Sequence, residues 1–485
     1  MKNFISQIKK IPTDELIFNL SEKSISMFAK GDYLMPINIP AIHYGQKKTL
    51  TITLTAWDIL DIEFLSIKES NDYRHSSKAV SIDTLIDLYR NYDNERSAKE
   101  GVFKNSNADE LFRTLMGMTA EQFLYQNPAW IFEKFNRDYY ILLAATNFEH
   151  RPEINVNAIV KGIFGFSADD YIALLLMVLW LCRQHPDPLT APKELYCKKD
   201  NTIFIPDNLF KIVNYYSCTY EDLRASFFKK QFLYSKPFIK TQKSSAYLSA
   251  SVFAVSMLVG NGLYWLIRDY YRNQGTQSFI NAFGYLFEDY IKDLSTKYCL
   301  PSEWSVLPTG TKKGADFTFN FGAIAFLVES KSSLIGLDVK QQIPNLNAAD
   351  TFFNRTIKKA YNQLNSSYSQ LVSKTSQPII KVILLYDEFS NSAIIEAAAN
   401  TILGTDPSCF IMTIREFEIL LYLHKNDKET EHQVLNEILL SSTSENHRKN
   451  IHAIYNDLSL HKNPHLDGEM DYFSKLMKHF EKELK

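Results

Sequence analysis

A nonpolar run of the chain ends in three polar residues that can do chemistry, Glu329, Ser330 and Lys331. The run itself, residues 323 to 328, reads AIAFLV and has the composition of a buried strand. An unpaired ion in a protein interior costs on the order of several kcal/mol, or its pKa shifts until it is neutral. Since side chains alternate along a strand, Glu329 and Lys331 share one face and Ser330 points to the other.

A second acid precedes this run in the sequence. Residues 320 to 322, Asn-Phe-Gly, have the composition of a turn, so residues 315–320 and 323–331 are predicted to pair as a hairpin. This pairing brings Asp316 alongside Glu329. Two carboxylates near one ammonium group suit a hard divalent cation such as Mg²⁺, because it prefers oxygen ligands and offsets the burial of the acids. The alternative is a structural ion pair at the end of a strand.

The segments around the hairpin alternate between helix and strand patterns. An amphipathic helix is predicted before it and a Lys- and Gln-rich helix after it, followed by further strands and short helices. The predicted helices are 277–298, 357–372, 392–403 and 415–423, and the further strands are 379–387 and 409–414. This order predicts an α/β domain.

This arrangement resembles the PD-(D/E)XK nuclease superfamily, which has the restriction-endonuclease-like fold. In that family an acid in the first strand of a hairpin is followed by Glu/Asp-x-Lys in the second, and Asp316 with Glu329-Ser330-Lys331 match this pattern. The family's preceding helix often carries a metal-associated Glu, here Glu288, and the following helix often carries a Gln near the site, here Gln363. The resemblance covers about residues 276–422. Gly-Ala-Asp stands here in place of the family's Pro-Asp.

The resemblance implies Mg²⁺-dependent hydrolysis of phosphodiester bonds, with Mn²⁺ able to substitute. The expected catalytic residues are Asp316, Glu329, Lys331, Glu288 and Gln363, and the expected metal ligands are Asp316, Glu329, Glu288 and the carbonyl of Ser330. Lys331 is expected to orient or deprotonate the attacking water and to stabilise the developing negative charge. The bland alternatives are a surface Glu at position 288 and a helix-face Gln at position 363.

We expect a DNA endonuclease of bacterial restriction or anti-phage defence, whose N-terminal half recognises nucleic acid, a trigger or a protein partner. The alternatives are a non-cleaving nucleic-acid-binding or assembly subunit that keeps the fold, and an RNA-cleaving nuclease. Motifs of other hydrolases are missing from the sequence, which has no His-Asp dipeptide, GxxxxGK[ST] loop or GxSxG serine.

Basic and aromatic residues are interleaved in the middle of the chain, where no acidic residue occurs between Asp222 and Asp269. Basic groups neutralise phosphates and aromatic rings stack on bases, so this segment is a candidate nucleic-acid contact. The alternative is a solvated linker whose rings pack on a neighbouring domain. The residues predicted to contact nucleic acid are Lys229, Lys230, Lys236, Lys240, Lys243, Lys312 and Lys313.

The length of 485 residues and an ordinary content of hydrophobic (45%) and charged (22%) residues predict a globular chain of several domains. The fold class expected is a restriction-endonuclease-like α/β nuclease core in the C-terminal half, with a mainly α-helical N-terminal region and a helical C-terminal tail. The expected segments are 1–70 (mixed α/β), 71–225 (helical), 226–275 (basic aromatic connector and apolar helix), 276–425 (nuclease domain) and 426–485 (helical tail). A homo-oligomer is expected, and the last helix is expected to dock on the body or on a second subunit.

The longest nonpolar runs, residues 171–182 and 251–267, are too short or too interrupted for membrane spans and are predicted to be core helices. The five cysteines are scattered and form no CxxC pair. We therefore expect a cytoplasmic protein without membrane association. The net charge of −2 gives no overall attraction to nucleic acid, so binding must depend on local clusters of basic residues.

Overall fold

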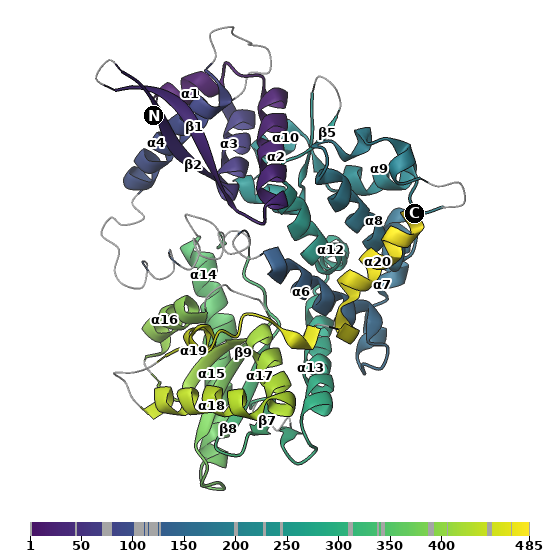
Figure 1. The fold of residues 1–485 in the computed structure, drawn as a ribbon. Helices are drawn as coiled ribbons and strands as arrows, with labels where there is room; N and C mark the ends of the chain where they lie inside the picture. Colours follow the sequence, from purple (N-terminus) through teal and green to yellow (C-terminus); the bar gives the residue numbers. More distant parts are fainter. Residues whose placement is uncertain are drawn as a thin grey trace.

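The structure is a computed structural model of a mixed α/β protein. It describes residues 2–43, 46–69, 80–100, 111, 115, 125, 128–197, 202–226, 229–242, 246–308, 314–336, 339–340, 345–386, 392–404, 406–443, 449–466 and 468–484. In Figure 1 the N-terminal part lies at one end, long helices fill the middle, and a sheet flanked by helices lies at the other end. The predicted class is confirmed at this level: the chain is mixed α/β, with a sheet in its C-terminal half.

A five-stranded mixed sheet forms the centre of the C-terminal half, in the order β10-β9-β8-β7-β6. The strands are β6 (Trp304–Val306), β7 (Phe317–Asn320), β8 (Ala325–Lys331), β9 (Ile379–Leu385) and β10 (Cys409–Thr413). Strands β6, β7 and β8 pair antiparallel, whereas β8, β9 and β10 pair parallel. The inner strand β9 is buried along its whole length, as its continuous nonpolar sequence requires. The predicted hairpin and both later strands are confirmed.

Helices cover both faces of this sheet. One face packs against α13 (Ser278–Tyr298) and α17 (Ile414–Asn426), through side chains that include Phe326 and Val328. The other face packs against α14 (Leu346–Phe352), α15 (Lys359–Leu371) and α16 (Ser392–Leu403), through side chains that include Leu327. A π-helical turn, Phe353–Lys358, joins α14 to α15. Successive side chains of β8 thus pack in two different hydrophobic cores, as expected from the two-residue period of a strand.

The N-terminal part folds around a two-stranded antiparallel sheet, β1 (Leu34–His43) and β2 (Gln46–Thr55). Around it lie α1 (Lys2–Ile8), α2 (Thr13–Ala29), α3 (Ala56–Glu69) and α4 (Ile82–Glu100). A three-stranded sheet in the middle of the chain contains β3 (Ser217–Cys218), β4 (Phe238–Lys240) and β5 (Tyr247–Ser249). The other helices are α6 (Pro128–Tyr139), α7 (Val156–Phe164), α8 (Ala168–Cys182), α9 (Pro206–Tyr215), α10 (Tyr220–Ala225), α11 (Phe232–Ser235), α12 (Val252–Asn273), α18 (Lys428–Thr443), α19 (Ile451–Asp457) and α20 (Tyr472–Leu484).

Both long nonpolar runs are core helices, as predicted, because residues 171–182 lie in α8 and residues 252–267 lie in α12, with Ser251 as its N-cap. Most side chains of both helices are buried. Within the described ranges, no single helix is long and apolar enough to cross a membrane. Helices α7 and α8 meet that requirement only when taken together, and they are bent by 60° relative to each other.

The helical middle of the chain and the C-terminal sheet share one hydrophobic core, which runs from Phe135 to Met470. Inside it, the guanidinium of Arg137 in α6 donates from Nε and a terminal nitrogen to the two carboxylate oxygens of Glu418 in α17, at 2.6 and 2.7 Å. Both side chains are fully buried. A paired arrangement of this kind is the strongest form of ion pair, and it ties two segments that are 281 residues apart.

The last helix, α20, docks on the body of the molecule. Phe473 packs against Phe132 and Phe135 of α6, with ring centres 4.2 and 5.8 Å apart. Leu476 and Met477 also pack against the shared core. In Figure 1 this helix, in yellow, returns to the helical middle of the chain instead of staying beside the sheet. Docking on the body, one of the two expected outcomes, is therefore confirmed.

Candidate active site

The two predicted acids meet at one end of the β7–β8 hairpin. In the register of the pair, Phe317 lies opposite Val328, and the N–H of Asp316 donates to the carbonyl of Val328 at 3.0 Å. Asp316 is therefore the residue opposite Glu329. The N–H and hydroxyl of Ser330 both donate to Asp316 Oδ2, at 2.8 and 2.7 Å. These bonds hold the Asp316 carboxylate against the end of β8.

Lys331 and Gln363 complete the arrangement on the face of β8 that meets α15. The ammonium of Lys331 donates to Glu329 Oε1 and, at 3.3 Å, to the side-chain oxygen of Gln363. The amide nitrogen of Gln363 donates to the carbonyl of Gly314 at 3.1 Å. Gln363 thus links Lys331 to the loop that carries Asp316.

Gly314 lets that loop lie close to α15. A Cβ atom at this position would come within 2.5 Å of Ser367 Oγ, which is closer than real Cβ contacts. The same Ser367 hydroxyl accepts a hydrogen bond from the N–H of Ala315 at 2.8 Å. The glycine of Gly-Ala-Asp therefore avoids a clash with the Ser367 hydroxyl that binds the next N–H of the loop.

Glu288 of α13 brings a third carboxyl group to the same place. Burial raises the pKa of Glu288 to about 7, and repulsion from Asp316 adds to this rise, while Lys292 and His150 oppose it. Burial likewise raises the pKa of Glu329 to about 8, with repulsion from Asp316 as the second cause and attraction to Lys331 opposing both. Three acids so close together destabilise one another's charged forms.

One oxygen of this cluster lacks any partner among the described residues. Glu329 has 1% of its surface exposed, and its Oε2 is buried with no hydrogen-bond donor within the part of the chain that the structure describes. A buried carboxylate oxygen without a donor costs about 1–3 kcal/mol or more. Glu329 Oε2 can therefore accept a cation or a hydrogen-bond donor that the described residues do not supply.

The donor set fits a hard divalent cation such as Mg²⁺. Asp316, Glu329 and Glu288 offer carboxylate oxygens, which Mg²⁺ prefers. The N–H of Ser330 points toward Asp316, and in a strand the carbonyl of a residue lies on the same edge as its N–H. The carbonyl of Ser330 can therefore act as a fourth oxygen ligand beside the acids.

His150, which the sequence did not indicate, lies next to this cluster. Its N–H donates to Asp289 Oδ2 at 2.9 Å, its ring Nδ1 contacts the same oxygen at 2.9 Å, and its ring stacks on Tyr285 with centres 4.8 Å apart. It comes from the loop between α6 and α7, 139 residues before Asp289. Only the packing of the helical middle against α13 brings His150 to the acids, so no local sequence pattern predicts this position.

The predicted nucleic-acid-binding lysines do not form one described patch. Lys230 is buried, with 7% of its surface exposed, and it lowers the pKa of the nearby Asp61 carboxyl, which burial alone would raise. Lys236 is half-buried and donates to the carbonyl of Tyr215, and Lys240 is exposed above the ring of Tyr247 at 5.7 Å. The side chain of Lys229 lies outside the described residues, as do Lys243, Lys312 and Lys313.

The aromatic residues of this middle segment pack inside the molecule where they are described. Phe238 and Tyr234 are buried, and Phe232 packs against the N-terminal core. This placement is the one expected of rings that pack on a neighbouring part of the chain. A role of the lysines in binding nucleic acid remains a prediction.

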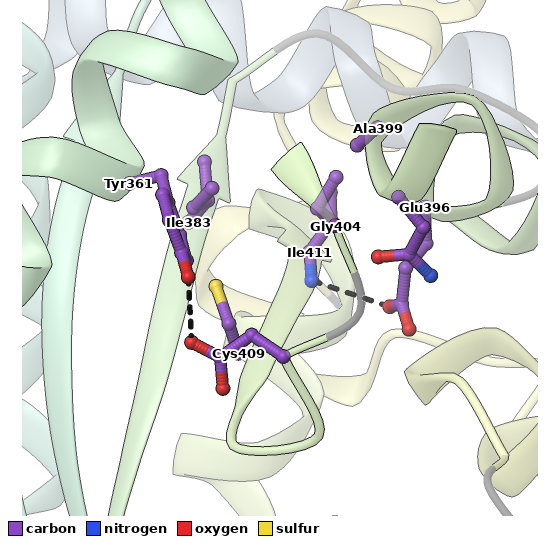
Figure 2. A pocket seen from close by; sticks show the side chains of 9 residues that line it. Tyr361, Ile383, Glu396, Ala399, Gly404, Cys409 and Ile411 are labelled. Carbon is purple, nitrogen blue, oxygen red and sulfur yellow. Dashed lines mark hydrogen bonds between the residues drawn. The ribbon is translucent and has the colours of Figure 1, made fainter. Parts of the chain in front are cut away.

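A separate small cavity lies beside β9 and β10 (Figure 2). Its walls include Tyr361, Glu396 and Asp406, and its volume is about 10 Å³. The hydroxyl of Tyr361 donates to Asp406 at 3.0 Å, and the N–H of Ile411 donates to Glu396 at 3.5 Å. A cavity of that volume holds about one water molecule, so it is too small for a substrate.

Comparisons with known proteins found no match: no family model matches this chain, and no curated protein or solved structure matches it significantly. The functional argument therefore depends on the geometry of Asp316, Glu329, Lys331 and their neighbours.

Proposed function

We propose that this protein is a metal-dependent nuclease of the PD-(D/E)XK type, which hydrolyses phosphodiester bonds, with DNA as the favoured substrate. The observation that carries the proposal is the buried Glu329, opposite Asp316 and beside Lys331, with one oxygen left without a donor among the described residues. A structural ion pair would need only Glu329 and Lys331. The additional carboxyls of Asp316 and Glu288 raise the pKa of Glu329 and would weaken such a pair.

The order of elements supports the same proposal. Helix α13 supplies Glu288, the β7–β8 hairpin supplies the two acids and the lysine, and α15 supplies Gln363. This is the order in which the family places its metal-associated Glu, its acid and Glu-x-Lys pattern, and its Gln. We therefore assign the restriction-endonuclease-like fold to the C-terminal half as part of the proposal.

In the proposed reaction, side chains of the protein position the reacting groups and stabilise the charge that develops on the phosphate. Asp316, Glu329 and the Ser330 carbonyl, with Glu288 beside them, would hold Mg²⁺, which would supply Lewis-acid activation of the phosphate and of water. The ammonium of Lys331 donates hydrogen bonds to the attacking water and to the negative charge that develops on the phosphate. Ser330 fixes Asp316, and Gln363 fixes Lys331, so both groups are in place before the substrate binds.

The remaining expectations belong to this proposal by analogy with nucleases of this fold, and no geometry of the chain carries them. They are a role in bacterial restriction or anti-phage defence, a cytoplasmic location and the pairing of subunits. A non-cleaving assembly subunit is the less favoured alternative, because it would have no use for several acids crowded around the half-buried Lys331.

The test is cleavage of plasmid DNA and of RNA by the purified full-length chain, with Mg²⁺, with Mn²⁺ or with a chelator. Lys331→Ala and Glu329→Gln should abolish cleavage, and Lys374→Ala, which removes an exposed lysine beyond the end of α15, serves as the matched control. Cleavage of either polymer that is indifferent to the chelator and to both active-site substitutions would eliminate the proposed mechanism. Cleavage of RNA alone would select the ribonuclease alternative.

A further inference from the structure

Three side chains with different donor atoms converge at the opposite end of the hairpin. They are Cys299, which follows α13, Glu303, which precedes β6, and His424 of α17. One ligand atom from each lies within 4.8 Å of the other two. The N–H of Asn320 donates to the carbonyl of Glu303 at 2.6 Å. Because Asn320 ends β7 at the turn, this cluster is separated from Asp316 by the length of the strand.

The polar contacts of the cluster orient the imidazole of His424. Its Nε2 contacts Glu303 Oε2 at 3.0 Å, and its Nδ1 contacts Glu431 Oε1. The ring also packs edge-on against Phe321, with centres 5.1 Å apart. Glu431 is buried and receives Lys428 Nζ at 2.9 Å, and the same ammonium lies 2.9 Å from His424 Nδ1. The ring is therefore held with Nε2 directed toward Glu303.

The thiol of Cys299 is the third donor of the cluster. The side chain is buried, and no hydrogen bond to its sulfur occurs within the described ranges. Its surroundings are partly open, because the side chain of Glu303 has 28% of its surface exposed. A small ion can therefore approach from the side of Glu303.

We propose that Cys299, Glu303 and His424 bind a zinc ion, with a water molecule as the fourth ligand. Thiolate, imidazole and carboxylate are the donors that zinc takes in proteins, whereas Mg²⁺ takes oxygen donors alone. A tetrahedral site with bonds of about 2.0–2.3 Å places its donor atoms about 3.3–3.6 Å apart. The side chains need to move by only about an ångström to reach those separations.

Glu431 would not bind the zinc ion itself but would hold the ring of the zinc ligand His424. A histidine that binds zinc through one nitrogen usually donates its other N–H to a carboxylate or carbonyl, which fixes the ring. The contact of His424 Nδ1 with Glu431 supplies this bond. Nothing in the proposed nuclease reaction uses it.

Charge and protons balance when the ion binds. Before the ion binds, His424 in its protonated form would bridge the carboxylates of Glu303 and Glu431, and Cys299 would carry its thiol proton. Zinc replaces these two protons, which are released to solvent, so the net charge of the cluster does not change. The ion would join the end of α13 to α17, the two helices that cover one face of the sheet. Its expected effect is on stability and does not depend on the proposed nuclease activity.

The experiment measures metal content and spectroscopy of the full-length chain. After exposure to Zn²⁺ and dialysis, the wild type should retain about one zinc per chain by elemental analysis. Loading with Co²⁺ instead should give a thiolate-to-cobalt charge-transfer absorption, and Zn²⁺ should raise the melting temperature. Cys299→Ser should lose the absorption and most of the retained zinc, whereas Cys197→Ser, which removes a half-buried thiol of another segment, should keep both.

Two further variants separate this proposal from the nuclease proposal. Glu431→Gln should weaken zinc binding about 10–100-fold without abolishing the cobalt absorption, as the loss of an outer partner does. Asp316→Asn should abolish DNA cleavage and leave zinc retention intact. The proposal is overturned if wild-type protein retains no more zinc than Cys299→Ser, or if Co²⁺ binds without the charge-transfer absorption.

Discussion

Divalent-cation binding at the candidate active site should weaken steeply as the pH falls below about 8, because its ligands must lose protons to bind the metal. The pKa of Glu329 is raised to about 8 and that of Glu288 to about 7. A carboxyl with a pKa of about 8 is about half ionised at about pH 8 and about 1% ionised at about pH 6. The affinity for Mg²⁺ should therefore fall about 50-fold over this range if Glu329 alone must ionise, or about 2.3 kcal/mol.

The participation of Glu288 makes the loss larger. A carboxyl with a pKa of about 7 adds a factor of about 10, so the total becomes about 500-fold, or about 3.7 kcal/mol. Isothermal titration calorimetry with Mg²⁺ at several pH values measures this dependence. Repeating the titrations near pH 7 in buffers of different ionisation enthalpy counts the protons released, which should be about 0.9 for Glu329 alone and about 1.4 for both acids.

Two variants assign the effect to its residues. Glu288→Gln should reduce the pH dependence from about 500-fold to about 50-fold, and Glu329→Gln should remove most of the binding. Glu396→Gln, which changes a buried acid of α16 whose carboxyl accepts from the N–H of Ile411, should leave both unchanged. Affinity that stays constant between about pH 6 and about pH 8, or that survives Glu329→Gln, would refute the reasoning about the buried acids.

Three other substitutions test separate parts of the structure. The carboxyl of Glu63 is fully buried, with no hydrogen-bond partner among the described residues, and burial raises its pKa well above the usual value. The folded chain keeps that proton while the unfolded chain releases it, so the stability of the fold falls as the pH rises above the unfolded-state pKa. Glu63→Met should therefore raise the free energy of unfolding in urea by about 1–3 kcal/mol, and by more at higher pH. Arg137→Met should lower the free energy of unfolding by about 3–5 kcal/mol, because it leaves Glu418 buried without its counterion. Adding Glu418→Met should restore much of the loss, and no recovery in the double variant would contradict this account. Gln363→Ala should lower kcat for DNA cleavage about 5–10-fold with little change in KM, since it removes one hydrogen bond that positions Lys331; an unchanged kcat would exclude that positioning role.

Local patterns were sufficient to predict the hairpin and the residues on it. Alternation along residues 323–331 determines which side chains of β8 share a face. The predicted Asn-Phe-Gly turn did not fix the register, because Asn320 pairs with Ala325 and the turn therefore spans residues 321–324. The position of α13 follows from its helical periodicity, whereas α15 begins at Lys359, two residues later than predicted, because the π-helical turn Phe353–Lys358 precedes it. The strand β6 was not predicted, because three residues are too few to display alternation.

Contacts between distant segments could not be predicted in the same way. His150 reaches α13 only because the helical middle packs against that helix, and Lys230 is buried because acids of α3 lie beside it. Neither partner can be chosen from composition or spacing, since many acids are available to each base. The boundaries of the five predicted segments likewise remain a prediction.

The buried pair of Arg137 and Glu418 has a practical consequence for anyone who wishes to dissect this protein. A fragment that begins near residue 276 would keep Glu418 but lose Arg137, together with the α6 side chains that cover α20. A lone carboxylate and a bare apolar surface would then remain in the excised piece, so it should be insoluble or misfolded when produced by itself. The two halves are inseparable parts, and activity should be sought in the intact polypeptide.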